Sequence, residues 1–329
     1  MRVNRFLILC FLVISFSLLS FMYGIQKNDL PAYFPVMMVP KGNEITPERI
    51  KLGKLLFFDK RLSVDESVSC SSCHKPELAF ADNRVISPGV KGRLGSRNAP
   101  TLTNVGFNPV YLFDGFLETL EKQAIVPIEE HAEMAFNIIE ITSRLASDKQ
   151  YQKLAKKAYN RELDPFVITR SLGVFQRTLV SSQSKYDAYL KGKAKFSAAE
   201  TEGLDLFFNQ LHCTKCHAGF NFTNFTTQNN GLYDSYADSG RMRVTKKESD
   251  RDLFKVPTLR NIALTAPYMH DGSLENLDEV IRHYESGGRS NKNKSPHLKS
   301  FVISDEDREN LIQFLNTLTD KKFIKKHSN

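Results

Sequence analysis

The hydrophobic positions divide the chain into an apolar leader and a series of amphipathic segments. An uninterrupted apolar run extends from Phe6 to Tyr23, behind Arg2 and Arg5 and ahead of a polar stretch. This arrangement is typical of a secretory signal peptide, which we place at residues 1–24. The run is also just long enough to cross a bilayer, so its retention as an N-terminal anchor stays open. In either case we expect the body of the chain to lie outside the cytoplasm.

Downstream of the leader, apolar residues recur at helical spacing and strand patterns are sparse. The segments expected to be helical are Leu117–Gln123, Ile138–Ala158, Phe166–Leu190, Leu277–Tyr284 and Asp305–Leu318. Two stretches rich in residues that favour turns, 81–108 and 220–239, are expected to be irregular loops. The pattern therefore predicts a mainly α-helical protein.

Two further helices are predicted from their start signals, and they form a weak internal repeat. Thr46-Pro47-Glu48 offers an N-cap followed by a proline in the first turn, and Ser197–Glu200 is a capping box. Each helix ends in a related sequence, Gly53–Asp59 in one case and Gly203–Asn209 in the other. At the other end of the chain, Ser304 is the expected cap of the last predicted helix.

A chain of 329 residues with 41% hydrophobic content can form more than one hydrophobic core. Together with the repeat, this predicts two domains, at residues 25–190 and 191–329, with Lys191–Lys195 as the linker. The net charge of +8 favours an acidic partner or an anionic surface. No phosphate-binding glycine loop is present, and an exported protein is not expected to bind nucleic acid.

Four of the five cysteines form two copies of one short motif. The copies are Cys70-Ser-Ser-Cys73-His74 and Cys213-Thr-Lys-Cys216-His217, whereas Cys10 belongs to the leader. Disulfides, a redox-active cysteine pair and a zinc site are the alternatives for such cysteines in an exported protein. Zinc ribbons, however, place their cysteine pairs about 15–20 residues apart. Neither zinc nor a disulfide requires a histidine after the second cysteine.

Covalent attachment of haem c explains the repeated histidine. Two thiols at this spacing reach the two vinyl groups of the porphyrin, and the adjacent imidazole becomes the proximal iron ligand. The sequence therefore predicts two haem c groups, one in each domain. The expected attachment residues and ligands are Cys70, Cys73 and His74 in the first domain and Cys213, Cys216 and His217 in the second.

The chain resembles the bacterial di-haem cytochrome c peroxidase family, which also contains the MauG-type enzymes. The resemblance extends from about Ile45 to Thr319. Besides the two haem motifs, it rests on Leu56–Asp59, Arg97–Thr101, Phe113–Gly115, Glu121–Ala124, Glu133–Met134, Val256–Asn261 and Thr265–Tyr268. It implies two cytochrome c-like helical domains. The N-terminal haem would react with peroxide, and the C-terminal haem would store and relay an electron.

The resemblance also assigns two polar side chains to the peroxide pocket. The family's distal glutamine and glutamate match Gln123 and Glu133, although spacing alone would make Glu133 an ordinary surface carboxylate. Cleavage of the O–O bond requires a proton to be taken from one oxygen and delivered to the other, which a carboxyl with a raised pKa can do. Glu133 is therefore the expected acid/base, and Gln123 is expected to orient the peroxide.

Family members that require reductive activation carry a removable distal histidine at the position of Val90. No histidine lies between His74 and His131 in this chain. We therefore predict a five-coordinate first haem that accepts peroxide without prior reduction. His131 is expected to be a surface residue rather than a ligand.

The sixth ligand of the second haem stays open between four residues. Tyr284 aligns with the methionine of the peroxidases and with the tyrosine of MauG-type enzymes, so it is the leading candidate. His283, Met269 and His270 are the alternatives. A tyrosinate would lower the haem potential relative to methionine.

Two further expectations concern the region between the haems. Phe113 stands where the family usually has a tryptophan, and the chain contains no tryptophan. Electron transfer is therefore expected to be slower or to use another route. The resemblance also implies one calcium ion, bound by residues that match Asn98, Thr265 and Pro267, because carbonyl and amide oxygens suit this cation. The alternative is that Asn98 is an ordinary turn residue.

The resemblance implies a periplasmic cytochrome-c peroxidase that reduces hydrogen peroxide to water, with electrons from a small c-type cytochrome or a similar donor. Two alternatives stay open: a MauG-like oxidase that modifies residues of a partner protein, and a non-catalytic di-haem electron carrier. Tyr284 and the absent loop histidine favour the oxidase, whereas Phe113 opposes it. Two six-coordinate haems would indicate the carrier. Formation of a homodimer by this chain also stays open.

Overall fold

The computed structural model describes residues 30–328, so the expected leader at residues 1–24 lies outside the described residues. By its contacts the chain divides into two compact units, Met1–Met37 and Met38–Asn329. The described part of the first unit contains one turn, in which the Phe34 amide donates to the Pro31 carbonyl (2.9 Å). All features discussed below belong to the second unit. Between residues 30 and 328, no helix has the length and apolar character needed to span a membrane.

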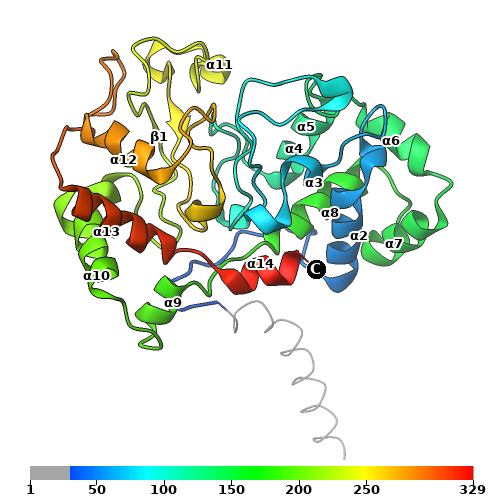
Figure 1. Ribbon diagram of the computed structural model, residues 1–329. Coiled ribbons are helices and arrows are strands. Elements are labelled where there is room, and N and C mark those ends of the chain that lie inside the picture. Colours follow the sequence, from blue (N-terminus) through cyan, green and yellow to red (C-terminus); the bar gives the residue numbers. More distant parts are fainter. Residues whose placement is uncertain (1–29, 329) are drawn as a thin grey trace, which may run out of the picture. The chain divides into compact units, whose positions relative to one another are not determined.

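The second unit is mainly α-helical, as predicted, with short connecting 3₁₀ and π turns (Figure 1). The α-helices of the described residues are α2 (Pro47–Phe58), α3 (Cys70–Cys73), α4 (Leu120–Gln123), α5 (Ile125–Glu129), α6 (Ile138–Leu145), α7 (Lys149–Tyr159), α8 (Pro165–Arg177), α9 (Lys185–Leu190), α10 (Ala198–Asp205), α11 (Met242–Thr245), α12 (Leu277–Glu285), α13 (Asp305–Asn316) and α14 (Lys321–His327). The short turns are η1 (Lys60–Leu62), η2 (Pro76–Leu78), η3 (Val90–Gly92), η4 (Val105–Phe107), η5 (Leu206–Gln210), η6 (Cys213–Lys215), η7 (Glu248–Asp250) and η8 (Ile262–Leu264). Strands β1 (Thr227–Gln228) and β2 (Phe254–Lys255) pair antiparallel.

Two segments predicted as single helices are each divided in two. The segment 138–158 forms α6 and α7, because the Asp148 carboxylate accepts the first amides of α7 and so starts a new helix. The segment 166–190 forms α8 and α9, which are separated by an extended stretch that ends at a capping box on Ser184. The apolar periodicity continues through both breaks, which is why it did not reveal them. The caps predicted at Thr46, Ser197 and Ser304 are confirmed.

The repeated glycines mark a close helix crossing in each half of the unit. Helix α2 packs against α8, and α10 packs against α13 (Figure 1). A Cβ at Gly53 would lie 2.0 Å from the carbonyl oxygen of Ser171, and one at Gly203 would lie 1.9 Å from that of Asn310. Only glycine permits such an approach of backbone to backbone. The sequence repeat therefore reflects a repeated packing arrangement.

The buried hydrophobic residues of the unit form two clusters. One draws on residues 52–179 together with Phe323 of α14, and the other draws on residues 206–318. Helix α14 thus follows the second half in sequence but packs on the first, next to η2 (Figure 1). The predicted domain boundary after residue 190 falls between the two clusters in sequence, and it stays a prediction.

Candidate haem and peroxide site

The first cysteine motif forms a single helical turn that presents a histidine at its end. Helix α3 begins at a capping box made by Ser69 and Ser72, and His74 follows its last residue. The Nδ1 atom of His74 lies 2.9 Å from the carbonyl oxygen of Phe80. With Nδ1 as the donor, Nε2 keeps its lone pair for a metal. Burial lowers the pKa of His74, which favours this neutral form.

The second motif repeats this arrangement. His217 follows η6, and its Nδ1 lies 3.1 Å from the carbonyl oxygen of Phe222. Burial also lowers the pKa of His217. All four cysteines of the two motifs carry free thiols, and burial raises the pKa of both Cys70 and Cys213 to about 12. The donor set thus fits two c-type haems, and the cysteines are not consumed by disulfides.

Glu133 lies beside the first motif. Burial is the main cause of the raised pKa values of Cys70 and Cys73, and the carboxylate of Glu133 contributes to both. The Glu133 side chain is exposed. Protein nevertheless surrounds its carboxyl closely enough that burial, followed by the charge of Glu130, raises its pKa. Such a carboxyl can exchange protons closer to neutral pH than an ordinary glutamate.

The loop that carries Val90 is attached to the backbone of Glu133. The Val90 amide donates to the Glu133 carbonyl (2.8 Å), and the Val90 side chain is fully buried. Gly89 makes this approach possible, because a Cβ there would lie 2.1 Å from the carbonyl oxygen of Ala132 and 2.5 Å from that of Glu133. An apolar side chain is therefore fixed at the position for which the family resemblance raised the question of a removable histidine. His131 is exposed.

Gln123 is the last residue of α4, and a buried ion pair fixes that helix. Nη1 and Nη2 of Arg177 donate to the two carboxylate oxygens of Glu121, at 2.7 and 3.0 Å. The Asn43 side chain adds a third bond to Glu121, at 2.6 Å. Since Arg177 belongs to α8, this pair attaches α4 to the helix that also packs on α2.

Tyr284 lies near the second cysteine motif. Burial raises the pKa of its hydroxyl to about 12, with smaller contributions from Cys216 and Cys213. These contributions indicate that the hydroxyl lies within electrostatic range of both thiols.

The other three candidate ligands contact different groups. Nε2 of His283 lies 2.9 Å from the Asn230 carbonyl oxygen, and Sδ of Met269 accepts from Asn230 Nδ2 at 3.1 Å. The His270 ring stacks on Phe254, with 4.0 Å between the ring centroids. Among the three titratable candidates, an influence of both thiols on the pKa is found for Tyr284 alone.

Phe113 belongs to a segment that residues from both halves hold in place. The Lys255 amide donates to the Phe113 carbonyl (2.7 Å). The next residue, Asp114, is buried and pairs with Arg97 (2.7 Å) and Arg243 (3.0 Å). Burial lowers the pKa of Lys255 to about 8, and no acidic group within residues 30–328 offsets this shift. An unpaired cation here fits a cofactor that carries carboxylates, as the haem propionates do.

The three residues expected to bind calcium lie on two segments that are hydrogen-bonded together. The Asn98 amide donates to the His270 carbonyl (2.8 Å), which brings Asn98 next to the segment of Thr265 and Pro267. The Asn98 side-chain Nδ2 donates to two carbonyls of the loop before it, at 3.0 and 3.1 Å. No cluster of three or more His, Cys, Asp or Glu suited to a metal is found in the described part of the chain.

Three features of the site were not predicted. The carbonyls of Phe80 and Phe222 orient the two histidines, and Asn230 contacts two of the candidate ligands. Backbone carbonyls leave no signature in residue types, so sequence patterns could not identify them. In the sequence, Gly89 is one of several loop glycines. Its close approach to the backbone of Ala132 and Glu133 depends on tertiary structure.

Comparison with known proteins agrees with this geometry. A family model described as di-haem cytochrome c peroxidase matches residues 47–195. The chain is 35% identical to the methylamine utilization protein MauG of Methylorubrum extorquens, over 85% of this chain and 80% of that protein. It is 38% identical to the cytochrome c551 peroxidase of Nitrosomonas europaea, over 84% of this chain and 82% of that protein. A crystal structure of a MauG-like protein associated with microbial copper homeostasis matches with a TM-score of 0.86 and 34% identity, over 91% and 97% of the two chains.

Proposed function

Because the chain belongs to the di-haem cytochrome c peroxidase family, we propose that it is a periplasmic peroxidase with one haem c in each half. One hydrogen peroxide, two protons and two electrons would give two waters, with the electrons supplied by a small c-type cytochrome or a similar donor. The observation that carries this proposal is the Glu133 carboxyl with its raised pKa, which lies beside the first cysteine motif next to a buried Val90.

Each half has the residues to hold one haem. Cys70 and Cys73 would form thioether bonds in the first half, where His74 would bind the iron from one side. When bound, this haem supplies an iron that takes up peroxide and passes electrons to it. Val90 offers no donor atom, so this position would supply no second protein ligand to the iron.

Two side chains would handle the peroxide itself. The Gln123 amide donates a hydrogen bond that orients it. Glu133 would take the proton from one peroxide oxygen and deliver it to the other, which leaves as water. Both protons that the overall reaction consumes would come from solvent, to which the Glu133 side chain is exposed.

The experiment that tests this proposal compares Glu133→Gln with Glu129→Gln, an exposed glutamate on α5. We expect Glu133→Gln to keep two haems and to lose about 10²- to 10⁴-fold in kcat/KM for peroxide, the usual contribution of general acid–base catalysis. Glu129→Gln should match the wild type. Equal turnover by all three proteins would remove Glu133 from its proposed role.

A MauG-like oxidase is the second candidate, and the position of Tyr284 favours it. Tyrosine ligation of the second haem lowers its potential and makes higher oxidation states more accessible. This function predicts a long-lived oxidised state after peroxide addition and slow oxidation of ferrocytochrome c. Rapid donor oxidation would exclude it.

We also propose one calcium ion at Asn98, Thr265 and Pro267, with the side-chain oxygen of Asn98 and backbone carbonyls as ligands. If it binds, calcium at 100 times its Kd should stabilise the fold by about 2.7 kcal/mol. Thermal unfolding after chelation, with and without added calcium, measures this difference. An unchanged Tm would refute the site.

A further inference from the structure

A five-residue sequence occurs once in each half, after the cysteine motif. Pro100–Asn104 and Pro257–Asn261 both have the sequence Pro-Thr-Leu-x-Asn. The final asparagine of each copy has a positive φ, 56° and 61° respectively, and starts a short turn, η4 or η8. Asparagine is one of the few residues that tolerate this conformation. The two halves therefore share this local structure as well as the glycine crossings.

In each copy the threonine holds the loop behind the proximal histidine of its own half. Thr101 Oγ1 donates to the Ala79 carbonyl (2.5 Å), and Thr258 Oγ1 donates to the Asn221 carbonyl (2.6 Å). Ala79 and Asn221 directly precede Phe80 and Phe222, whose carbonyls contact the two histidines. Each copy therefore fixes the acceptor that orients one iron ligand.

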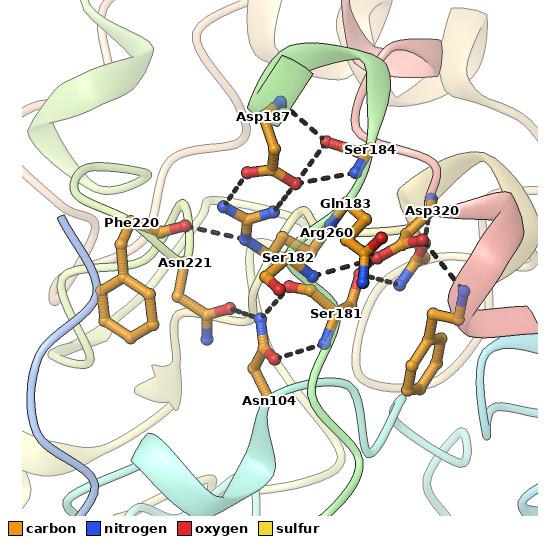
Figure 2. Close-up of polar contacts among 12 residues, drawn as sticks. Asn104, Ser181, Ser182, Gln183, Ser184, Asp187, Phe220, Asn221, Arg260 and Asp320 are labelled. Carbon is orange, nitrogen blue, oxygen red and sulfur yellow. Dashed lines mark hydrogen bonds and ion pairs between the residues drawn. The ribbon is translucent and has the colours of Figure 1, made fainter. Parts of the chain in front are cut away.

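The asparagines connect each copy to the opposite half. Asn104 Nδ2 donates to Asn221 Oδ1 (3.0 Å), as Figure 2 shows. Asn261 Nδ2 donates to Thr103 Oγ1 (3.2 Å), which in turn donates to the Ala79 carbonyl (3.4 Å). The four side chains that make these bonds are at most 2% exposed. The loops behind the two histidines are thus joined through buried hydrogen bonds.

Neighbouring groups hold this connection rigidly. Asn104 Oδ1 accepts the Ser181 amide (2.8 Å). Arg260 donates from Nε to the Phe220 carbonyl (2.8 Å) and forms a fully buried ion pair with Asp187 (Figure 2). In a buried network no water replaces a lost partner, so a displacement of one loop is passed to its neighbours.

We infer that Asn104 and Asn261 are positioning residues that couple the two haems, so that the proximal hydrogen bond at each iron depends on the opposite half. This inference rests on the proposed function only in requiring both haems. A histidine that donates from Nδ1 to a carbonyl is a more basic ligand. Weakening the hydrogen bond between the histidine and that carbonyl should therefore raise the reduction potential of the haem in the same half.

The test exchanges each asparagine for glycine, which keeps the positive φ and removes the amide. Asn261→Gly should raise the potential of the first haem, and Asn104→Gly should raise that of the second. We expect about a tenfold change in the equilibrium constant for reduction, which is 59 mV for one electron. Spectroelectrochemical titration of the holoprotein measures both potentials without peroxide.

Tyr151→Phe is the control, because it removes a hydrogen bond to Asp59 (2.7 Å) from a residue in neither loop. It should lower the Tm and leave both potentials unchanged. If a glycine variant fails to fold, Thr103→Val keeps the shape but removes the hydroxyl between Asn261 and the Ala79 carbonyl, and a raised potential of the first haem is expected.

Lower Tm values with unchanged potentials in every variant would show that the network only holds the halves together, and would overturn the inference. In that case normal peroxide turnover by the same variants would leave the proposed function intact. Shifted potentials in a protein that does not turn over peroxide would support the coupling and refute the peroxidase.

Discussion

Adding one methyl group at Gly89 tests how the first site is assembled. In Gly89→Ala the new Cβ would lie 2.1 Å from the Ala132 carbonyl oxygen and 2.5 Å from that of Glu133. Separations under 3.0 Å are essentially never tolerated, so the backbone at Ala132 has to move by about 0.9 Å or more. Overpacking of this kind typically costs about 1–3 kcal/mol of stability. A misplacement of about 1 Å in a catalytic group can cost roughly 10²-fold in rate.

Gly95→Ala is the matched control, because its Cβ would meet no atom within 4 Å. We expect its stability to stay within about 0.5 kcal/mol of the wild type, with normal activity. Peroxide-dependent oxidation of ferrocytochrome c and thermal unfolding, measured on both variants with full haem content, give the comparison. The reasoning fails if Gly89→Ala retains wild-type kcat/KM, or if Gly95→Ala loses as much activity.

Further predictions concern Glu133, Tyr284 and Arg177. Because burial raises the pKa of Glu133 above 4.5, kcat/KM for peroxide should fall as pH drops through that raised pKa, and Glu133→Gln should lack this acid limb. For stability the carboxylate form is the disfavoured one, so the wild type should lose stability relative to Glu133→Gln as pH rises through the same pKa. Tyr284→Met should raise the potential of the second haem, by about tenfold or more in the reduction equilibrium, and an unchanged potential in redox titration would exclude Tyr284 as its ligand. Arg177→Met leaves the carboxylate of Glu121 without its main partner, so the free energy of unfolding measured with denaturant should fall by about 3–5 kcal/mol. The double variant Arg177→Met/Glu121→Leu should recover part of this loss. No recovery would contradict the ion-pair explanation.

The helical fold was predictable where local chemistry is decisive. Thr46, Ser197 and Ser304 cap their helices as expected, because an N-cap needs only its own side chain and the next few amides. The breaks before α7 and α9 were missed. The capping residues Asp148 and Ser184 were present in the sequence, but an unbroken apolar period outweighed them.

The candidate site also has parts that the sequence predicts and parts that it does not. Its cysteines and histidines were predicted from spacing, and Gln123 and Glu133 were predicted from the family resemblance; their roles stay predictions. The attachment of the Val90 loop to Glu133 depends on a contact between distant segments, and so do the carbonyls of Phe80 and Phe222. Residue patterns cannot report such contacts, because they depend on backbone atoms that every residue has.

Low-temperature EPR of the oxidised wild-type protein tests the central claim most directly. The account predicts two ferric haems per chain, with a high-spin signal from the first, whose iron has His74 on one side and no protein ligand on the other. The signal should change on addition of peroxide without prior reduction. Two low-spin haems, or fewer than two ferric irons per chain, would contradict it.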